Sequence, residues 1–295
     1  MLSKYLKVKS GKLHYYHHEN PGKPRLLCLH GYLDTGKSFT FIDPWLQQHF
    51  DIVYLEWPGH GKSPLNDGFF HGSALVGVVV EAVNALFDAP FYLLGHSLGA
   101  AYGARVAGII SEKIKGIVLF EGFSGLAPID DEAERLVTWA KQIEKPLPVK
   151  KRMLTLKAAR NVIGSRNSRL SKETVETLLK NLTKKKRGQL QWHFDERVRT
   201  GFIPISFHPE LSRALWRRIN CPVMVIYGDK TPFNPGRFAG KAKPAGLREE
   251  MKEILSHFRD VELKIIEGCG HNFHHENPAA VISLLKEFFS ERCPL

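Results

Sequence analysis

The stretch Phe91–Ala100, with the sequence FYLLGHSLGA, decides the fold because it places a sharp turn between a strand and a helix. Its first four residues are apolar and typical of a buried strand, and the small residues after it predict a helix over 100–110. The turn reads G-x-S-x-G, in the strand–turn–helix context that this motif requires. So tight a turn leaves no room for bulk two residues before and after the serine, where Gly95 and Gly99 stand. We therefore expect Ser97 at the end of the strand, with its hydroxyl exposed.

The length and composition indicate a globular protein of one large domain, or of one domain with an inserted lobe. The chain has 295 residues, of which 43% are hydrophobic and 24% are charged. Residues 1–6 lack the apolar core of a signal peptide. The most apolar helix candidate, 74–87, is interrupted by Glu81 and Asn84. We therefore expect neither a secretion signal nor a transmembrane segment.

The cysteine and histidine patterns predict neither disulfides nor a metal site. No C-x-x-C pair is present, so we expect free thiols in a reducing compartment, with the cytoplasm as the location. The four cysteines are Cys28, Cys221, Cys269 and Cys293. Because H-E-x-x-H, G-x-G-x-x-G and Walker patterns are all missing from the sequence, we expect no metal and no organic cofactor.

Nearly all of the positive charge lies in one segment, 125–220. This segment has 21 lysines and arginines but 10 aspartates and glutamates, a net charge of +11 in a chain whose net charge is +12. Helices are expected in it, because Asp131 and Glu134 have the spacing of a capping box and Ser171 precedes an amphipathic pattern. The run of four cations at 184–187 is most simply a solvated surface.

Apolar runs that alternate with helical patterns predict a mostly parallel sheet with helices on both faces. The expected strands, after an amino-terminal hairpin at 7–9 and 12–16, are 26–29, 51–55, 91–94, 114–120, 223–227 and 261–266. Besides the helix over 100–110, helices are expected from about residue 38 and over 74–87, 247–258 and 279–289. In such sheets the ligand crevice lies beyond the carboxyl ends of the strands, where the glycine-flanked polar clusters of this chain fall. Segment 125–220 lies between two strands and is expected to cover that crevice.

A serine hydroxyl is a weak nucleophile and needs a neighbouring base that a third group orients. His271 follows the last strand, in EGCGHNFHHENP, and is the candidate base because Gly268 and Gly270 let the loop fold back. His274 and His275 are close alternatives at the approach to the final helix. Three other histidines, each beside a glycine or the serine, are expected to pack and hydrogen bond: His30, His60 and His96.

Acyl transfer also requires hydrogen-bond donors aimed at the developing oxyanion. The backbone N–H of Leu98, at the start of its helix, is one candidate donor. The second is expected from the loop after strand 26–29, at the N–H of Tyr32.

Four motifs, in this order along nearly the whole chain, resemble those of the α/β-hydrolase superfamily: LHGYLD, PGHGKS, GHSLGA and GCGHNFHHENP. Within the superfamily the chain is similar to the serine hydrolase-like group, on HGYLDTGKSF and on the stretch 195–198. The resemblance implies an α/β-hydrolase core over 1–124 and 221–295, with a helical lid over 125–220.

The acid that completes the triad departs from the usual pattern. Many relatives carry G-x-x-D-x-x-x-P after the penultimate strand, but here Thr231 holds the place of the acid and Asp229 lies two residues early. Some relatives instead place the acid after the strand that follows the elbow helix, and in this chain that position is Glu121. We favour Glu121, since a carboxylate at the end of an apolar strand needs a partner. A turn-capping role for Asp229 and an ion pair between Glu121 and a lid arginine are the alternatives.

The resemblance implies a serine hydrolase that cleaves a carboxylic ester or a thioester through an acyl-enzyme. Ser97 is the expected nucleophile, and a serine there argues against the reactions of dehalogenases and epoxide hydrolases. Two other functions stay open: hydrolysis of a carbon–carbon bond by the same triad, and ligand binding without catalysis, which Thr231 would explain.

The basic segment suggests two kinds of partner. One is a small acyl ester or thioester with an anionic group or carrier, and the other is peripheral contact with an anionic membrane surface. No nucleic-acid recognition motif accompanies the charge, so nucleic-acid binding is not expected.

Overall fold

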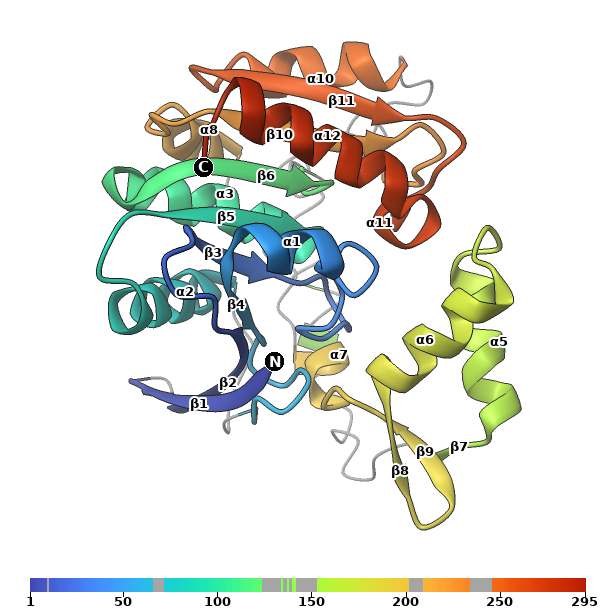
Figure 1. Cartoon of the computed structure of the whole chain (residues 1–295). Helices are drawn as coiled ribbons and strands as arrows, with labels where there is room; N and C mark the ends of the chain where they lie inside the picture. The colour runs from blue at the N-terminus through green and yellow to red at the C-terminus, as the bar shows by residue number, and fades with distance from the viewer. Residues whose placement is uncertain are drawn as a thin grey trace.

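A twisted eight-stranded sheet forms the centre of the molecule (Figure 1). The computed structural model describes residues 1–9, 11–65, 72–123, 134, 137, 140–141, 153–201, 209–233 and 246–295. The strand order is β1-β2-β4-β3-β5-β6-β10-β11. Strand β2 pairs antiparallel with β1 and β4, and all other neighbours in this sheet are parallel. The predicted mostly parallel sheet is thus confirmed.

The strands of this sheet are β1 (Leu2–Val8), β2 (Gly11–His18), β3 (Arg25–Leu29), β4 (Asp51–Leu55), β5 (Phe91–His96), β6 (Ile114–Phe120), β10 (Val223–Gly228) and β11 (Val261–Ile266). The helices that flank the sheet are α1 (Asp43–His49), α2 (Gly72–Leu86), α3 (Leu98–Ile109), α8 (Pro209–Trp216), α10 (Leu247–Leu255) and α12 (Pro278–Glu291), and the short helix α11 (Phe273–Glu276) precedes the last one. A 3-10 turn at Ser111–Lys113 leads into β6.

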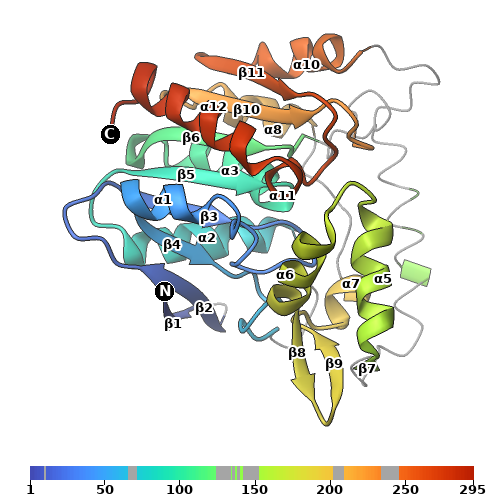
Figure 2. The same cartoon turned by 45° about the vertical axis from the view of Figure 1, so that its right-hand side comes forward.

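Both faces of the sheet are covered, because its central strands are apolar on both sides. Successive side chains of a strand point to opposite faces. In β3, Leu27 and Leu29 belong to the apolar cluster that also contains residues of α2, α3, α8 and α10, whereas Leu26 and Cys28 belong to the cluster that contains residues of α1 and α12 (Figures 1 and 2). Two separate apolar cores follow, one on each face.

Helix α1 begins later than predicted. The sequence suggested a start near Ser38, but the chain from Thr35 makes successive turns, with backbone bonds from Ser38 to Thr35 and from Ile42 to Phe39. The helix begins only at Asp43, where a proline occupies its first turn. Proline is favoured at that position because it donates no backbone hydrogen bond and its φ suits a helix.

The chain between β6 and β10 carries an inserted lobe, defined here as residues 153–201. Its elements are β7 (Met153–Leu154), α5 (Leu156–Arg166), α6 (Lys172–Leu182), β8 (Thr183–Lys186), β9 (Gln189–Trp192) and α7 (Arg197–Gly201). The predicted cap of α6 is confirmed, since the Ser171 side chain accepts a bond from the Thr174 N–H. The lobe is not purely helical, because β7, β9 and β8 form a small antiparallel sheet.

The position of the inserted lobe is beside the carboxyl ends of the strands (Figures 1 and 2). Its own apolar cluster contacts the core at Leu33 and Phe41, in the segment after β3. Helix α8, at the carboxyl side of the insertion, lies against α3 instead, and Arg105 of α3 donates to the Ser212 hydroxyl. The boundaries 125–220 of the lid stay a prediction, and the predicted capping box at Asp131 lies outside the described residues.

No helix within the described ranges combines the length and the apolar composition that a membrane span requires.

Candidate active site

The turn between β5 and α3 is strained at the serine. Ser97 has φ +53° and ψ −112°, a backbone conformation that residues other than glycine rarely adopt. Such strained residues cluster at functional sites. A Cβ at Gly95 would lie 2.6 Å from the Gly99 carbonyl oxygen, and one at Gly99 would lie 2.0 Å from that of Leu29. The close backbone contacts explain why both positions are glycine. The strain is held in place by the Ser97 N–H, which donates to the Phe120 carbonyl of β6 at 2.8 Å.

Glu121 lies directly after β6 and contacts His271. Its side chain is 1% exposed, and its Oε2 is 2.6 Å from Nδ1 of His271. Two further donors hold the carboxylate: the Gly228 N–H at 3.1 Å and the Thr231 hydroxyl at 2.6 Å. A buried carboxylate would be costly without partners, and these three bonds supply them.

Asp229 is not in this cluster. Its Oδ2 lies 2.7 Å from Nζ of Lys230, and the hydrogen bond from that ammonium group lowers the pKa of the Asp229 carboxyl. The structure therefore brings Glu121, rather than Asp229, to the imidazole of His271. Thr231, which stands where many relatives have the acid, donates its hydroxyl to Glu121.

His96, the last residue of β5 and the neighbour of Ser97 in the chain, contacts His271. Nε2 of His96 lies 3.2 Å from the carbonyl oxygen of His271, and the two imidazole rings are 4.9 Å apart. Across the described ranges, no hydrogen bond joins the Ser97 hydroxyl to the His271 imidazole. Since Glu121 engages Nδ1, Nε2 is the nitrogen that remains for the serine proton. Such bonds are often long in ligand-free proteins and tighten when substrate binds.

The loop after β3 passes directly beside the serine. A Cβ at Gly31 would lie 2.9 Å from Nδ1 of His96 and 3.4 Å from Cβ of Ser97. Tyr32 is the next residue of this loop, and Leu98, on the other side, is the first residue of α3 after Ser97. The two predicted oxyanion donors belong to segments that meet at the serine, as an oxyanion hole requires.

Histidines 30 and 60 support this loop in their neutral form. Nε2 of His60 accepts the Leu33 N–H at 3.1 Å, and its Nδ1 donates to the Pro58 carbonyl. His30 has the same arrangement: Nε2 accepts the Trp57 N–H at 3.3 Å and Nδ1 donates to the Gly31 carbonyl at 2.8 Å. Burial lowers the pKa of His30, and burial together with the nearby His30 lowers the pKa of His60 to about 3. A proton on either Nε2 would face a backbone donor.

We expect the free energy of unfolding to fall as the pH decreases below about 6.5. The folded pKa of His60 is below its unfolded value of 6.5, so the unfolded chain binds more protons between these values. The contribution of such a histidine to the free energy of unfolding is therefore fully present above pH 6.5. Below that pH it decreases by up to about 1.4 kcal/mol per pH unit for each such histidine. Urea denaturation at several pH values measures the slope, and His60→Gln should reduce it. Parallel profiles for the two proteins would contradict this assignment.

Burial also lowers the pKa values of three more histidines near the site: His96, His274 and His275. The two alternative bases are fully enclosed, and Nε2 of His275 donates to the Ser38 carbonyl at 2.8 Å. His271 is the more accessible imidazole, with 19% of its side chain exposed.

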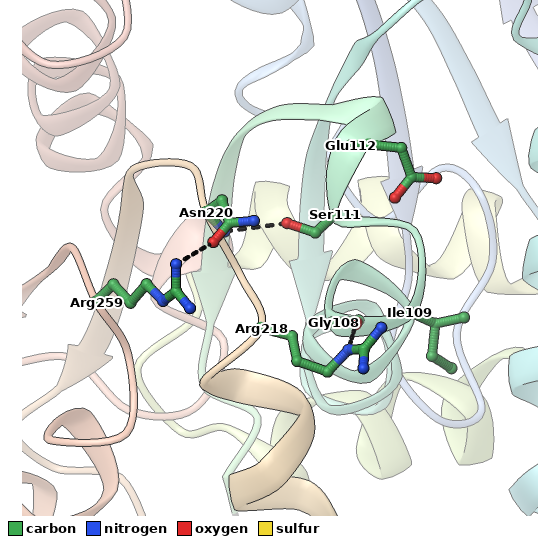
Figure 3. Close-up of a pocket in the computed structure, with 7 residues that line it drawn as sticks. All are labelled: Gly108, Ile109, Ser111, Glu112, Arg218, Asn220 and Arg259. Carbon is green, nitrogen blue, oxygen red and sulfur yellow. Dashed lines mark hydrogen bonds between the residues drawn. The ribbon is translucent and has the colours of Figure 1, made fainter.

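A separate pocket of about 270 Å³ lies where the chain enters strands β6, β10 and β11, at their amino ends. Figure 3 shows the residues that line it. Its lining includes Ser111, Arg218, Asn220 and Arg259, and it contains none of the predicted site residues. Within the described part of the chain, His, Cys, Asp and Glu side chains form no group of three that could hold a metal ion.

Comparisons with known proteins agree with this architecture. The model of the family described as "Alpha/beta hydrolase family" matches residues 26–284. A serine hydrolase-like protein of Mus musculus is 30% identical over 88% of this chain and 86% of its own length, and serine hydrolase-like protein 2 of Homo sapiens is 28% identical over 90% and 86%. Among solved structures, the thioesterase domain from the curacin biosynthetic pathway has a TM-score of 0.77 at 22% identity. It covers 97% of this chain and 99% of its own, and supports the fold alone.

Proposed function

Since the chain belongs to the alpha/beta hydrolase family, we propose that it is a serine hydrolase that cleaves a carboxylic ester or thioester through an acyl-enzyme. The observation that carries the proposal is the pairing of His271 with the buried carboxylate of Glu121, beside the strained elbow at Ser97. A base oriented by an acid is what a serine hydroxyl needs to react as a nucleophile.

The proposed reaction has two half-steps. Nε2 of His271 takes the proton of the Ser97 hydroxyl as its oxygen attacks the substrate carbonyl, and then gives that proton to the leaving alcohol or thiol. The negative charge of Glu121 stabilises the imidazolium and keeps the Nδ1 proton in place. The N–H groups of Tyr32 and Leu98 donate to the oxyanion. Water then repeats the sequence on the acyl-enzyme.

The bonds to Glu121 weaken the alternative of a binding protein without catalysis. That alternative rested on the threonine at the usual position of the acid. In the structure Thr231 donates to Glu121, so an acid is present at the base although it comes from the neighbouring strand.

We propose the inserted segment as the lid of the active site, with residues 125–220 as its extent. In support, the apolar cluster of the lobe packs on Leu33, directly after the proposed oxyanion donor Tyr32, and the Tyr32 hydroxyl donates to the Val198 carbonyl at 3.3 Å. The positive charge of the segment favours substrates with an anionic group or carrier, and it is also compatible with contact to an anionic membrane surface. The four free, buried thiols support the cytoplasm as the location.

Covalent labelling tests the proposed function. A fluorophosphonate should modify the folded protein at Ser97, as peptide mapping would show, and should not modify protein that has been unfolded by heat. A panel of p-nitrophenyl esters of increasing acyl length, with anionic and neutral members matched in size, then defines the substrate. Folded protein that remains unlabelled and hydrolyses no ester of the panel would exclude the proposal.

A further inference from the structure

The carboxylate of Glu276, at the end of α11, bridges the loop of the base and the inserted lobe. Its Oε2 accepts the N–H of Gly270 at 2.9 Å, directly before His271 in the chain. Its Oε1 accepts a hydrogen bond from the side-chain Nδ2 of Asn167, at the end of α5, at 2.6 Å. Asn167 is only 7% exposed, so the contact is formed inside the interface between lobe and core.

This bridge requires a side chain at position 276 that accepts two hydrogen bonds, one at each end. The Gly270 N–H and the Asn167 amide nitrogen are both donors, and a carboxylate is the side chain that accepts at both ends. The orientation of Asn167 is fixed from the other side, because its Oδ1 accepts the N–H of Arg169 at 3.1 Å. A glutamine at 276 would place one donor against another.

The same loop is held at each neighbouring peptide group. The Cys269 carbonyl accepts the Lys230 N–H at 2.9 Å, and the His271 carbonyl accepts from His96. The lobe also packs against the loop directly, since a Cβ at Gly270 would lie 3.0 Å from Nη1 of Arg169. Of the bonds named here, the one through Glu276 is the one that continues into the lobe.

We propose that Glu276 is a positioning residue that couples the seating of the inserted lobe to the placement of the base His271. This inference rests on the proposed function of His271. When the lobe is seated, Asn167 holds the carboxylate of Glu276 toward Gly270, which fixes the backbone from which the imidazole extends. When the lobe lifts, the carboxylate turns to water and the Gly270 N–H loses its acceptor. A substrate that keeps the lobe seated thereby keeps the base in place.

An exchange of the two side chains tests the coupling. In Glu276→Gln, the new amide nitrogen lies against another hydrogen-bond donor, either the Gly270 N–H or the Asn167 amide nitrogen. In Asn167→Asp, the new carboxylate lies against the carboxylate of Glu276. In the double variant, the new amide nitrogen at 276 donates to the new carboxylate at 167, and its oxygen accepts from Gly270. Each single substitution should lower kcat about tenfold, because the altered bonds act on the placement of the base. The double variant should recover to within about threefold of wild type.

Amide hydrogen exchange at Gly270 provides a readout that does not depend on catalysis. The exchange rate should increase in both single variants and return toward wild type in the double variant. Asn181→Ala is the matched control, since it removes another bond between lobe and core, from Asn181 to the Thr40 hydroxyl at 3.3 Å. This variant should leave kcat and the Gly270 exchange rate unchanged.

Two results would overturn the coupling: unchanged Gly270 exchange in the single variants, or losses that simply add in the double variant. A wild-type protein that turns over no ester would instead overturn the proposed function of His271. In that case the exchange rates still decide whether Glu276 joins the lobe to the loop.

Discussion

Replacing Ser97 with alanine is expected to lower kcat for ester hydrolysis by about a millionfold, with little change in KM. The substitution removes the oxygen that would form the acyl-enzyme and leaves the fold intact, because alanine is smaller than serine. His271→Ala should cost about as much, since a hydroxyl without a base is a poor nucleophile. The double variant should lose no more than either single variant, because the two groups act as a unit. Steady-state kinetics on the best ester of the panel measures all three.

Thermal melting provides the control for these variants, which should remain folded. A loss of less than about tenfold in Ser97→Ala would show that another group is the nucleophile. Losses that multiply in the double variant would show that the serine and the histidine act in separate steps.

Glu121→Gln is expected to lower kcat by about ten thousandfold. The amide has no charge to stabilise the imidazolium. Its nitrogen would donate to Nδ1 of His271, which moves the ring proton to Nε2, so the nitrogen that must accept the serine proton is blocked.

Asp229→Asn is the matched control, with the same loss of charge two residues from Thr231. We expect kcat within about twofold of wild type, because Asp229 pairs with Lys230 and not with the base. The reverse ranking of the two variants would assign the acid to Asp229.

The central sheet could be predicted because its strands are short, apolar on both faces and separated by helical patterns. Strands β4, β6 and β11 have the predicted bounds, and β5 differs only where the chain continues into the elbow. Helices α2, α3, α10 and α12 are found where the periodicity places them, within three residues at each end, whereas α1 begins later than predicted and α8 was not predicted.

The inserted lobe was harder to predict, because its strands do not show the usual alternation. Strand β8 contains three exposed lysines in succession, which in sequence resemble a solvated surface. These residues form a strand because β9 pairs with them and buries Leu190 and Trp192 in the cluster of the lobe. Pairing of this kind depends on tertiary contacts that override local propensity.

The site could be predicted where a residue type requires a particular partner. A buried carboxylate after β6 needs a partner, and the structure places His271 against it. The contributions of Thr231 and Glu276 carry no local signal, since a threonine and a glutamate are ordinary residues in a loop and a short helix. These contributions can be recognised only in the folded structure, where residues far apart in the sequence form a hydrogen bond. Glu121 and Thr231, for example, are 110 positions apart.

The bond between Thr231 and Glu121 limits how many acids this site can hold. Strands β6 and β10 are parallel neighbours, and the residues that follow them meet in one hydrogen bond, from the Thr231 hydroxyl to Glu121. An aspartate at position 231 would place a second carboxylate against that of Glu121, and two such charges at close range repel each other. A single charged acid beside His271 therefore fits this arrangement, and the threonine supplies a hydrogen-bond donor in place of a second charge.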